Sequence, residues 1–383
     1  MKKAVKITIF IAIGMVIIGT AMAFVSMAAC GFNMKNLMET EKYEVKSYVL
    51  DDDFDDIVIN VDSDSFAIYK SEDEKTHVEV FESEKMKYDV SVNNKVLNIE
   101  SQQLEDGFDF SKMHFVVDFR QEPCKVFLPK EEYESLRTKI ESGSFTSGQP
   151  FTFHDAQIEL GSGSLRIDSM KAEELTGTSK SGSIDVFNIT ANNATLEAGS
   201  GSVKLEEAGI DGTLKLKSTS GSVKVIKTEC KNADIRTGSG SLLLDHVKCA
   251  ENLEASVSSG SIKMEEVVAG GNLKAKTGSG SISFTSCDAK DLDLQTSSGS
   301  VHGTLKTGKM FNAKANSGSV NVPDDDANGG VCRIHTGSGS IKVTLVGSED
   351  GSDPSIDEDF DDEFEEALEE EIEAAMEEAS DVE

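Results

Sequence analysis

Apolar and polar residues alternate on both sides of a tripeptide, Ser-Gly-Ser, that recurs from Leu136 to Val346 about every twenty residues. In all eleven repeats the residues seven before and two after the central glycine are apolar, and those six and four before it are polar. This alternation predicts a strand with one buried face on each side of the glycine. The central glycines are Gly143, Gly163, Gly182, Gly201, Gly221, Gly240, Gly260, Gly280, Gly299, Gly318 and Gly339.

So steady a period predicts a stacked architecture in which each repeat is one coil that packs mainly on its neighbours. We therefore expect an all-β fold, a parallel β-solenoid whose coils each hold two short strands joined at the Ser-Gly-Ser corner. A variable loop then leads to the next coil. The corner glycine is expected to have a positive φ or a close backbone neighbour. The serines are expected to bond to the backbone and to form ladders.

Two other interpretations of the repeat are weaker. A glycine-rich phosphate loop requires a helix N-terminus after the glycines, whereas strand residues follow each tripeptide here. Leucine-rich repeats share the period, but their Leu-x-x-Leu-x-Leu frame and asparagine ladder are absent from the sequence.

The first 34 residues predict a membrane anchor. Three lysines precede an uncharged run, Ile7–Phe32, that is long enough to cross a bilayer as a transmembrane helix. The positive flank places the N-terminus in the cytoplasm and the rest of a single-pass protein outside the cell membrane. Two alternatives stay open: cleavage after the small residues 21–23, or a lipoprotein lipidated at Cys30, which follows Met27-Ala28-Ala29.

Residues 40–135 lack the tripeptide but are rich in strand patterns, and we expect this part to begin or cap the solenoid of residues 136–348. Asn93-Asn94 predicts a hairpin turn between two of its strands. The expected strands are Ile57–Val61, His77–Val80, Tyr88–Val92, Val96–Ile99 and His114–Asp118.

Two segments of this region resemble a known family. Phe54-Asp55-Asp56-Ile57-Val58-Ile59 is similar to the family's first strand. Val126-Phe127-Leu128-Pro129, followed by Tyr133-Glu134-Ser135-Leu136 and Glu141-Ser142-Gly143-Ser144, resembles the start of its repeats. The family is DUF4097, described as adhesin-like and frequent in membrane-anchored proteins of Gram-positive bacteria. The resemblance, over about residues 45–346, implies a β-solenoid surface protein and transfers no catalytic residues.

The tail, residues 349–383, is a separate acidic block with 19 acidic and no basic residues, and it holds most of the net charge of −32. Apolar residues recur in it every fourth position, which predicts an amphipathic helix over about 357–379. This helix either caps the last coil or docks on a basic partner. Its charge argues against an anionic lipid surface. The apolar positions are Phe360, Phe364, Leu368, Ile372 and Met376.

One segment is a candidate calcium site. Asp324, Asp326 and Asn328, with the glycine that follows, match the start of a calcium loop, although position twelve is His335 instead of glutamate. The alternative is a polar turn. Ca²⁺ is the one cofactor that the sequence suggests.

Six cysteines occur, at positions 30, 124, 230, 249, 287 and 332. Cys230 and Cys249 both lie nine residues after a central glycine, so they should stack on adjacent coils. Either a disulfide or a pair of free thiols is consistent with that spacing. No Cys/His spacing suggests zinc.

The charges and aromatic residues narrow the function. The repeats are nearly neutral, which argues against nucleic acid binding. A stripe of basic residues lies three positions after the glycines. It could contact anionic wall polymers or only keep the sheet surface solvated, and we favour the second role. The four histidines of the repeat region share no coil position and are expected to be isolated surface residues. The stripe consists of Arg166, Lys204, Lys224, Lys263 and Lys342.

The sequence thus predicts a non-catalytic, adhesin-like binding protein that presents a rigid β-solenoid outside a bacterial membrane to an envelope protein or glycan. The alternative is an envelope structural or stress-regulatory interaction protein. A carbohydrate-active enzyme is a third and weaker interpretation, because scattered polar residues offer no paired carboxylates and no aromatic row follows the repeats. The oligomeric state stays open.

Overall fold

The computed structural model describes residues 43–104 and 122–347, and every described element is a β-strand. The described residues divide into two compact units. Residues 43–45, 81–87 and 103–104 form the smaller one, in which the N–H of Leu104 donates to the carbonyl of Lys85 over 2.8 Å. All other described residues belong to the second unit, which contains the solenoid.

The N-terminal strands are β1 (Glu44–Leu50), β2 (Asp56–Ser63), β3 (Phe66–Lys70), β4 (Thr76–Glu82), β5 (Met86–Asn93), β6 (Val96–Gln103) and β7 (Cys124–Leu128). The repeats begin with β8 (Glu132–Ser142), β9 (Phe145–Ser147), β10 (Phe151–Ser162), β11 (Leu165–Ile167), β12 (Met170–Ser179), β13 (Ile184–Ala198), β14 (Val203–Ser218) and β15 (Val223–Thr237). They continue with β16 (Leu242–Cys249), β17 (Leu253–Ser259), β18 (Ile262–Glu265), β19 (Val268–Ser279) and β20 (Ile282–Ser298). The last are β21 (Val301–Leu305), β22 (Met310–Ala315), β23 (Val320–Asn321), β24 (Val331–Ser338) and β25 (Ile341–Leu345).

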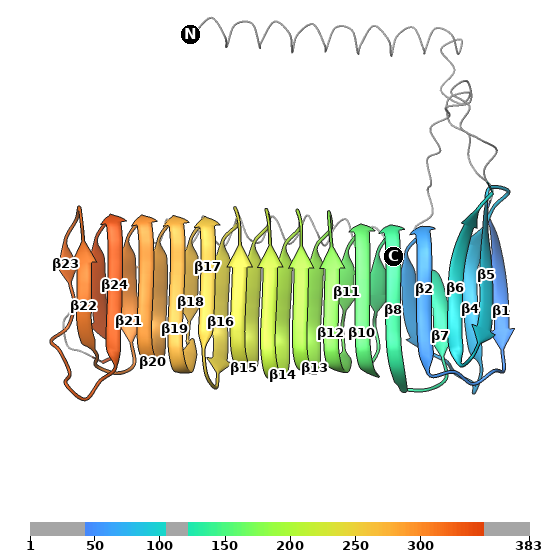
Figure 1. Ribbon diagram of the computed structural model, residues 1–383, viewed down its shortest axis with the longest axis horizontal. Coiled ribbons are helices and arrows are strands. Elements are labelled where there is room, and N and C mark those ends of the chain that lie inside the picture. Colours follow the sequence, from blue (N-terminus) through green and yellow to red (C-terminus); the bar gives the residue numbers. More distant parts are fainter. Residues whose placement is uncertain (1–42, 105–121, 348–383) are drawn as a thin grey trace, which may run out of the picture. The chain divides into compact units, whose positions relative to one another are not determined.

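The predicted parallel β-solenoid is confirmed, and its coils stack in register. Val203 pairs with Val223, and Leu214 with Ala233, in parallel ladders that run from coil to coil. Figure 1 shows these strands side by side along the solenoid. Inward side chains are buried on both sides of the corner, as in Leu214 and Val223 with 0 % exposure. The apolar ladders therefore form one continuous core.

The middle coils have three segments each, so the expectation of two strands per coil was incomplete. After the second segment the alternation breaks, and inward positions resume seven and nine residues after the glycine, as at Ile189 and Ala191. A residue with positive φ makes the extra corner, six residues after the glycine, in six successive coils. These residues are Asn188, Glu207, Lys227, His246, Glu266 and Ser286, with φ of 45–56°.

The Ser-Gly-Ser corner requires glycine because successive coils approach closely there. A Cβ on Gly182 would lie 2.0 Å from the carbonyl oxygen of Gly163 in the preceding coil. Real side chains do not tolerate that distance, and Gly163 itself has a φ of 134°. The close backbone approach is found at the corner glycines, and six of the eleven also have a positive φ. The corner thus selects glycine for a reason that depends on the neighbouring coil.

Hydroxyl groups tie adjacent corners together. The N–H of Ser222 donates to Oγ of Ser202 in the coil before it, over 3.1 Å, and the same bond recurs along the stack. In the core, Thr237 Oγ1 donates to the carbonyl of Gly221 in the coil before it, over 2.6 Å. The predicted serine ladder is therefore present. A hydroxyl three residues before the glycine reinforces it in six coils, at Ser179, Ser218, Thr237, Thr277, Thr296 and Thr336.

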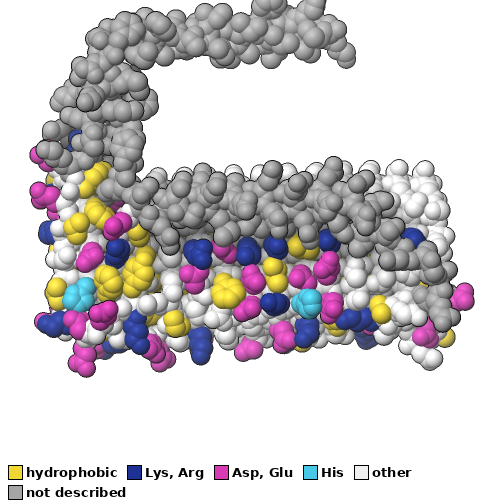
Figure 2. All heavy atoms as spheres, turned by 180° about the vertical axis from the view of Figure 1, so that it is seen from behind, with side chains coloured by type: hydrophobic (Ala, Val, Ile, Leu, Met, Phe, Trp, Pro, Cys, Tyr) yellow, Lys and Arg dark blue, Asp and Glu magenta, His cyan; other side chains and the backbone are white. Residues whose placement is uncertain are grey.

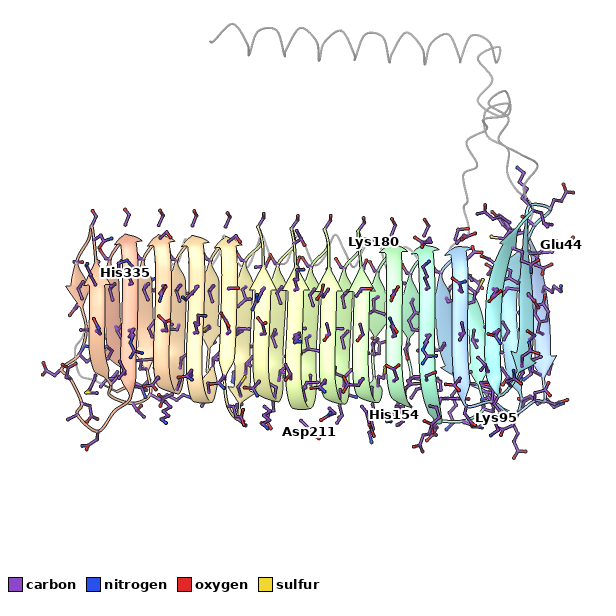
Figure 3. All side chains as sticks on the ribbon, in the orientation of Figure 1. Glu44, Lys95, His154, Lys180, Asp211 and His335 are labelled. Atoms are coloured by element: carbon purple, nitrogen blue, oxygen red, sulfur yellow. The ribbon has the colours of Figure 1, made fainter. Side chains whose placement is uncertain are left out.

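A second ladder lies at the corner before the first segment. The backbone N–H and Nδ2 of Asn272 both donate to Oδ1 of Asn252, over 3.1 and 2.9 Å. Asn252 makes the same bonds to Asn232. In Figure 3, Asp211 of this corner lies at the edge opposite Lys180, which is next to a Ser-Gly-Ser corner. This asparagine ladder was not predicted from the sequence.

Chain order and stacking order differ at both ends of the stack. β2 and β3 pair with β8 and β9 on one side and with β6 and β7 on the other. At the other end, β24 and β25 insert between the coil of β20–β21 and the coil of β22–β23. The coil around Gly318 is therefore the last of the stack, and the C-terminal coil is the one before it.

The two ends also finish differently. On the N-terminal side, antiparallel β4 pairs with β7 through Val78 and Val126, and so covers its edge. Asn94 and Lys95, both with positive φ, form the turn between β5 and β6, one residue later than expected. Among the described residues, no strand pairs with the outer edge of β22 or β23.

Residues 43–104 and 122–347 contain no helix long and apolar enough to span a membrane. The predicted anchor, the lipidation residue Cys30 and the acidic tail helix all lie outside the described residues, and so does the strand expected at 114–118.

Candidate binding surface

The outward side chains before the glycine form what we call the pre-glycine face, and its charges pair among themselves. Lys274 contacts Glu254 across adjacent coils at 2.5 Å, and Lys217 approaches Glu197 at 3.7 Å. Arg236 Nε donates to Asp234 in the same strand over 2.6 Å. Surface pairs of this kind stabilise little, but together they leave a polar and nearly neutral face.

The outward side chains three and five residues after the glycine form the post-glycine face, where the predicted basic stripe lies. Three of its five members contact an acidic residue two positions further on. The pairs are Arg166 with Asp168 at 2.9 Å, Lys204 with Glu206 at 3.2 Å, and Lys263 with Glu265 at 3.3 Å. The stripe is thus largely neutralised, which supports the solvating role over contact with anionic polymers.

Between these pairs the post-glycine face exposes apolar side chains. Phe187 is 38 % exposed at an outward position, and Ile226 and Leu243 are half-buried there. Figure 2 shows yellow patches of this kind among blue and magenta side chains. In the adjacent coil Glu206 is the register partner of Phe187. Protein interfaces commonly have an apolar centre within a polar rim, so this part of the face is a candidate binding patch.

The pKa of one carboxylate on this face, that of Asp185, is raised. Asp185 lies in register between Arg166 and Lys204, and burial raises its pKa while the two cations oppose that rise. The row of alternating charge beside Phe187 is therefore fixed by the register of three coils.

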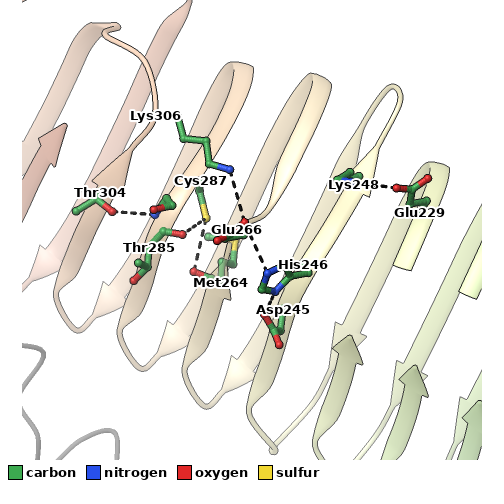
Figure 4. Close-up of polar contacts among 11 residues, drawn as sticks. Glu229, Asp245, His246, Lys248, Met264, Glu266, Thr285, Cys287, Thr304 and Lys306 are labelled. Atoms are coloured by element: carbon green, nitrogen blue, oxygen red, sulfur yellow. Dashed lines mark hydrogen bonds and ion pairs between the residues drawn. The ribbon is translucent and has the colours of Figure 1, made fainter. Parts of the chain in front are cut away.

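His246 stands at the corner where the post-glycine face ends, in contact with two carboxylates (Figure 4). Its Nδ1 lies 2.5 Å from Asp245 Oδ1, and its Nε2 lies 3.6 Å from Glu266, which also approaches Lys306 at 4.0 Å. The hydrogen bond to Asp245 raises the pKa of His246. The expectation of an isolated surface histidine is wrong here, because stacking brings Glu266 of the next coil to the ring.

An aromatic row that was not predicted from the sequence crosses the strands before the repeats. Phe127 of β7 stacks on Tyr69 of β3 with ring centroids 5.6 Å apart and meets His77 of β4 edge-on at 6.5 Å. All three are half-buried on the outward face. His77 Nε2 bonds to Asp73, whose pKa is thereby lowered to about 2. Their alternation with buried residues was visible in the sequence, but the pairing of β3 with β7 was not.

The candidate calcium residues lie in the loop between β23 and β24. Asp326 Oδ1 accepts the N–H of Asn328 over 2.9 Å, and Asp325 Oδ1 accepts the N–H of Phe311 in β22 over 2.7 Å. Over the described residues, no group of three or more His, Cys, Asp or Glu side chains is arranged to hold a metal ion. Asp324, Asp326 and Asn328 stay a prediction for calcium, whereas the loop itself has a structural role at the edge of β22.

Cys230 and Cys249 stack on adjacent coils, as their spacing predicted. They are register partners, both are buried, and their Sγ atoms lie 3.0 Å apart as free thiols. The hydrogen bond between them and burial raise the pKa of Cys249. A disulfide between them stays a prediction.

Fold and surface together define a parallel β-solenoid protein with long outward faces. The chain belongs to the Toastrack DUF4097 family, whose model matches residues 54–266 and 234–353. This confirms the resemblance found in the sequence.

Several crystal structures are similar to this chain. One is named "putative lipid binding protein" from Parabacteroides distasonis ATCC 8503, with 15 % identity over 80 % of this chain and 99 % of that chain, and a TM-score of 0.43. A second, a "putative adhesin" from the same organism, has 15 % identity, covers 80 % of this chain and 99 % of its own, and has a TM-score of 0.34. A "putative adhesin" from Parabacteroides merdae ATCC 43184 has 13 % identity, covers 80 % of this chain and 98 % of its own, and has a TM-score of 0.30. None of the curated proteins matches the chain.

Proposed function

We propose that this protein is a non-catalytic binding protein of the bacterial cell surface and that its post-glycine face contacts an envelope protein. The observation that carries the proposal is the contrast between the two faces. Both faces carry paired charges, but the post-glycine face also exposes Phe187 among them.

Two further features support a binding role. The stacked backbone holds outward side chains about 4.8 Å apart in fixed register, so the surface loses little conformational entropy on binding. An aromatic side chain with satisfied charges around it is the composition of an interface hot spot. A glycan is the second candidate partner, favoured by the aromatic row of Tyr69, Phe127 and His77, since aromatic rings on protein surfaces stack on sugars.

A photo-crosslinking amino acid placed on each face tests the proposal in cells that make the full chain. It replaces Phe187 on the post-glycine face or Lys217 on the pre-glycine face, both of which are exposed. We expect a discrete protein adduct from position 187 and none from position 217. Adducts of equal yield from both positions, or none from either, would contradict the assignment of the binding face. An adduct from a probe at Tyr69 that digestion of glycans removes would favour the second candidate.

A further inference from the structure

Among the described residues, none covers the core at the last coil of the stack. Val320 of β23 occupies the position two after its glycine, which is fully buried in other coils, yet it is 45 % exposed. Phe311 and Ala313 of β22, also at core positions, are half-exposed for the same reason. Met310 beside them is 42 % exposed. The apolar ladders therefore reach solvent at this end, where an exposed apolar surface favours a covering partner.

The backbone edge at this end is open as well. Met310 and Asn316 donate their N–H groups to Gly330 and Thr336 on the β24 side. Because N–H groups alternate in direction along a strand, those of Ala313 and Ala315 face outward. Asp325 accepts the outward N–H of Phe311 and so covers only the beginning of the edge.

The strands of the last two coils are also basic. Strands β22 to β25 contain no acidic residue, and they contain Lys314, Arg333, His335 and Lys342. Within the described part of the chain, Lys314, Arg333 and Lys342 form no ion pair, unlike the paired lysines of the middle coils. The strands at this end therefore carry unpaired cations around an apolar centre, while the acidic residues of this end, Asp324, Asp325 and Asp326, lie in the loop between β23 and β24.

The chain itself carries a segment of matching chemistry. It leaves the penultimate coil after β25, whose Ile341 is the register partner of Val320, so the tail starts beside the open end. From 348 to Phe360 the chain can span up to about 40 Å. Beyond it the acidic tail presents its apolar stripe, and its carboxylates are good acceptors for lysine, arginine and free N–H groups.

We propose that the acidic tail of this chain, residues 349–383, covers the open end formed by β22 and β23. The apolar stripe packs on Phe311, Ala313 and Val320, and the flanking carboxylates face Lys314 and Arg333. A short tether holds the tail at a high effective concentration, so the intramolecular contact is favoured over an equivalent segment from another molecule. A second copy of the chain, stacked end to end on the same coil, is the competing occupant.

Hydrogen exchange on the full chain in lipid nanodiscs tests this proposal. We compare the wild-type protein with F364S/L368S, which breaks the stripe, and with E366Q/E370Q, which changes the other side of the predicted helix. F364S/L368S should speed exchange in residues 310–321 about tenfold, and E366Q/E370Q less than twofold. Residues 203–216 in the middle of the stack should be unchanged in both variants. Equal exchange at 310–321 in wild type and F364S/L368S would overturn the proposal.

A photo-crosslinking residue in place of Met310 identifies the occupant directly. We expect an adduct within one chain to a peptide from residues 349–383, at a yield independent of protein concentration. An adduct between two chains, with yield rising with concentration, would show a second copy at this end and refute the tail as its cover. The absence of any adduct would refute both occupants.

Discussion

Val223 and Val320 occupy the same position in their coils, two residues after the central glycine, yet their exposures are 0 % and 45 %. Their local sequences are alike, Ser-Gly-Ser-Val in both, and both follow the same serine ladder. The difference is that Val223 has a coil on each side and Val320 has a coil on one side only. In a solenoid, a residue's repeat position sets its direction, and the neighbouring coil decides whether it is buried.

Substitution of a corner glycine should cause the largest loss of stability. In G182A, the added Cβ would lie 2.0 Å from the Gly163 carbonyl oxygen, so both coils must shift. We expect a loss of about 3 kcal/mol or more in the free energy of unfolding. G318A produces a similar clash, with Gly339, but at the last coil. Denaturant unfolding should show a global loss for G182A, while hydrogen exchange shows a local loss for G318A. A global loss from G318A would contradict the difference between end and middle.

A matched truncation tests burial directly. V223A removes two buried methyl groups from the middle of the core and should cost about 2 kcal/mol. In the F364S/L368S background, where the proposed tail contact is broken, V320A removes the same atoms from a half-exposed site and should cost less than about 0.5 kcal/mol. Chemical denaturation of both variants measures the two values. Equal costs would mean that the end coil is covered as fully as the middle ones.

Oxidation should join two thiols in the middle of the stack and spare one near its end. Cys230 and Cys249 have Sγ atoms 3.0 Å apart, whereas burial raises the pKa of Cys332 to about 12 and keeps it protonated. After mild oxidation we expect two fewer titratable thiols and a gain near 1 kcal/mol, because strain between in-register strands offsets most of the chain-entropy term. C249S serves as the control. Loss of the titratable Cys332 thiol instead would show that burial does not protect it from oxidation.

The smallest expected effect on stability is the pH-dependent contribution of His246. Asp245, and then Glu266, raise its pKa above the ordinary 6.5. Because the folded pKa exceeds the unfolded one, protonated His246 stabilises the fold fully below about pH 6.5, and this contribution disappears as the pH rises through the folded-state pKa. An NMR titration should show a raised pKa that D245N returns toward 6.5, with a smaller change in E266Q. An unchanged pKa in D245N would remove the assigned cause.

Strands, their inward residues and the stacking of like positions could be predicted from the sequence, because each depends on residues close to one another along the chain. The register partners Cys230 and Cys249 followed from the period alone. The third segment could not be predicted, because its corner residues, such as Glu207 and Lys227, are ordinary polar residues that do not signal a positive φ in the sequence. Only part of the candidate surface was predicted from the sequence. The basic stripe was identified, but its acidic partners and the exposed Phe187 were not.

The repeat pattern alone sets the solenoid, its coil length and the need for glycine at each corner, because every coil carries the same local arrangement of residues. The order of the coils at the two ends depends instead on contacts between distant segments. β24 stacks against β20, and the later coil thus lies inside the earlier one. Any two coils of this chain are nearly interchangeable as neighbours, so the repeat pattern cannot say which one is last. The last coil's uncovered core follows from that order, and so does the place where the chain leaves the stack.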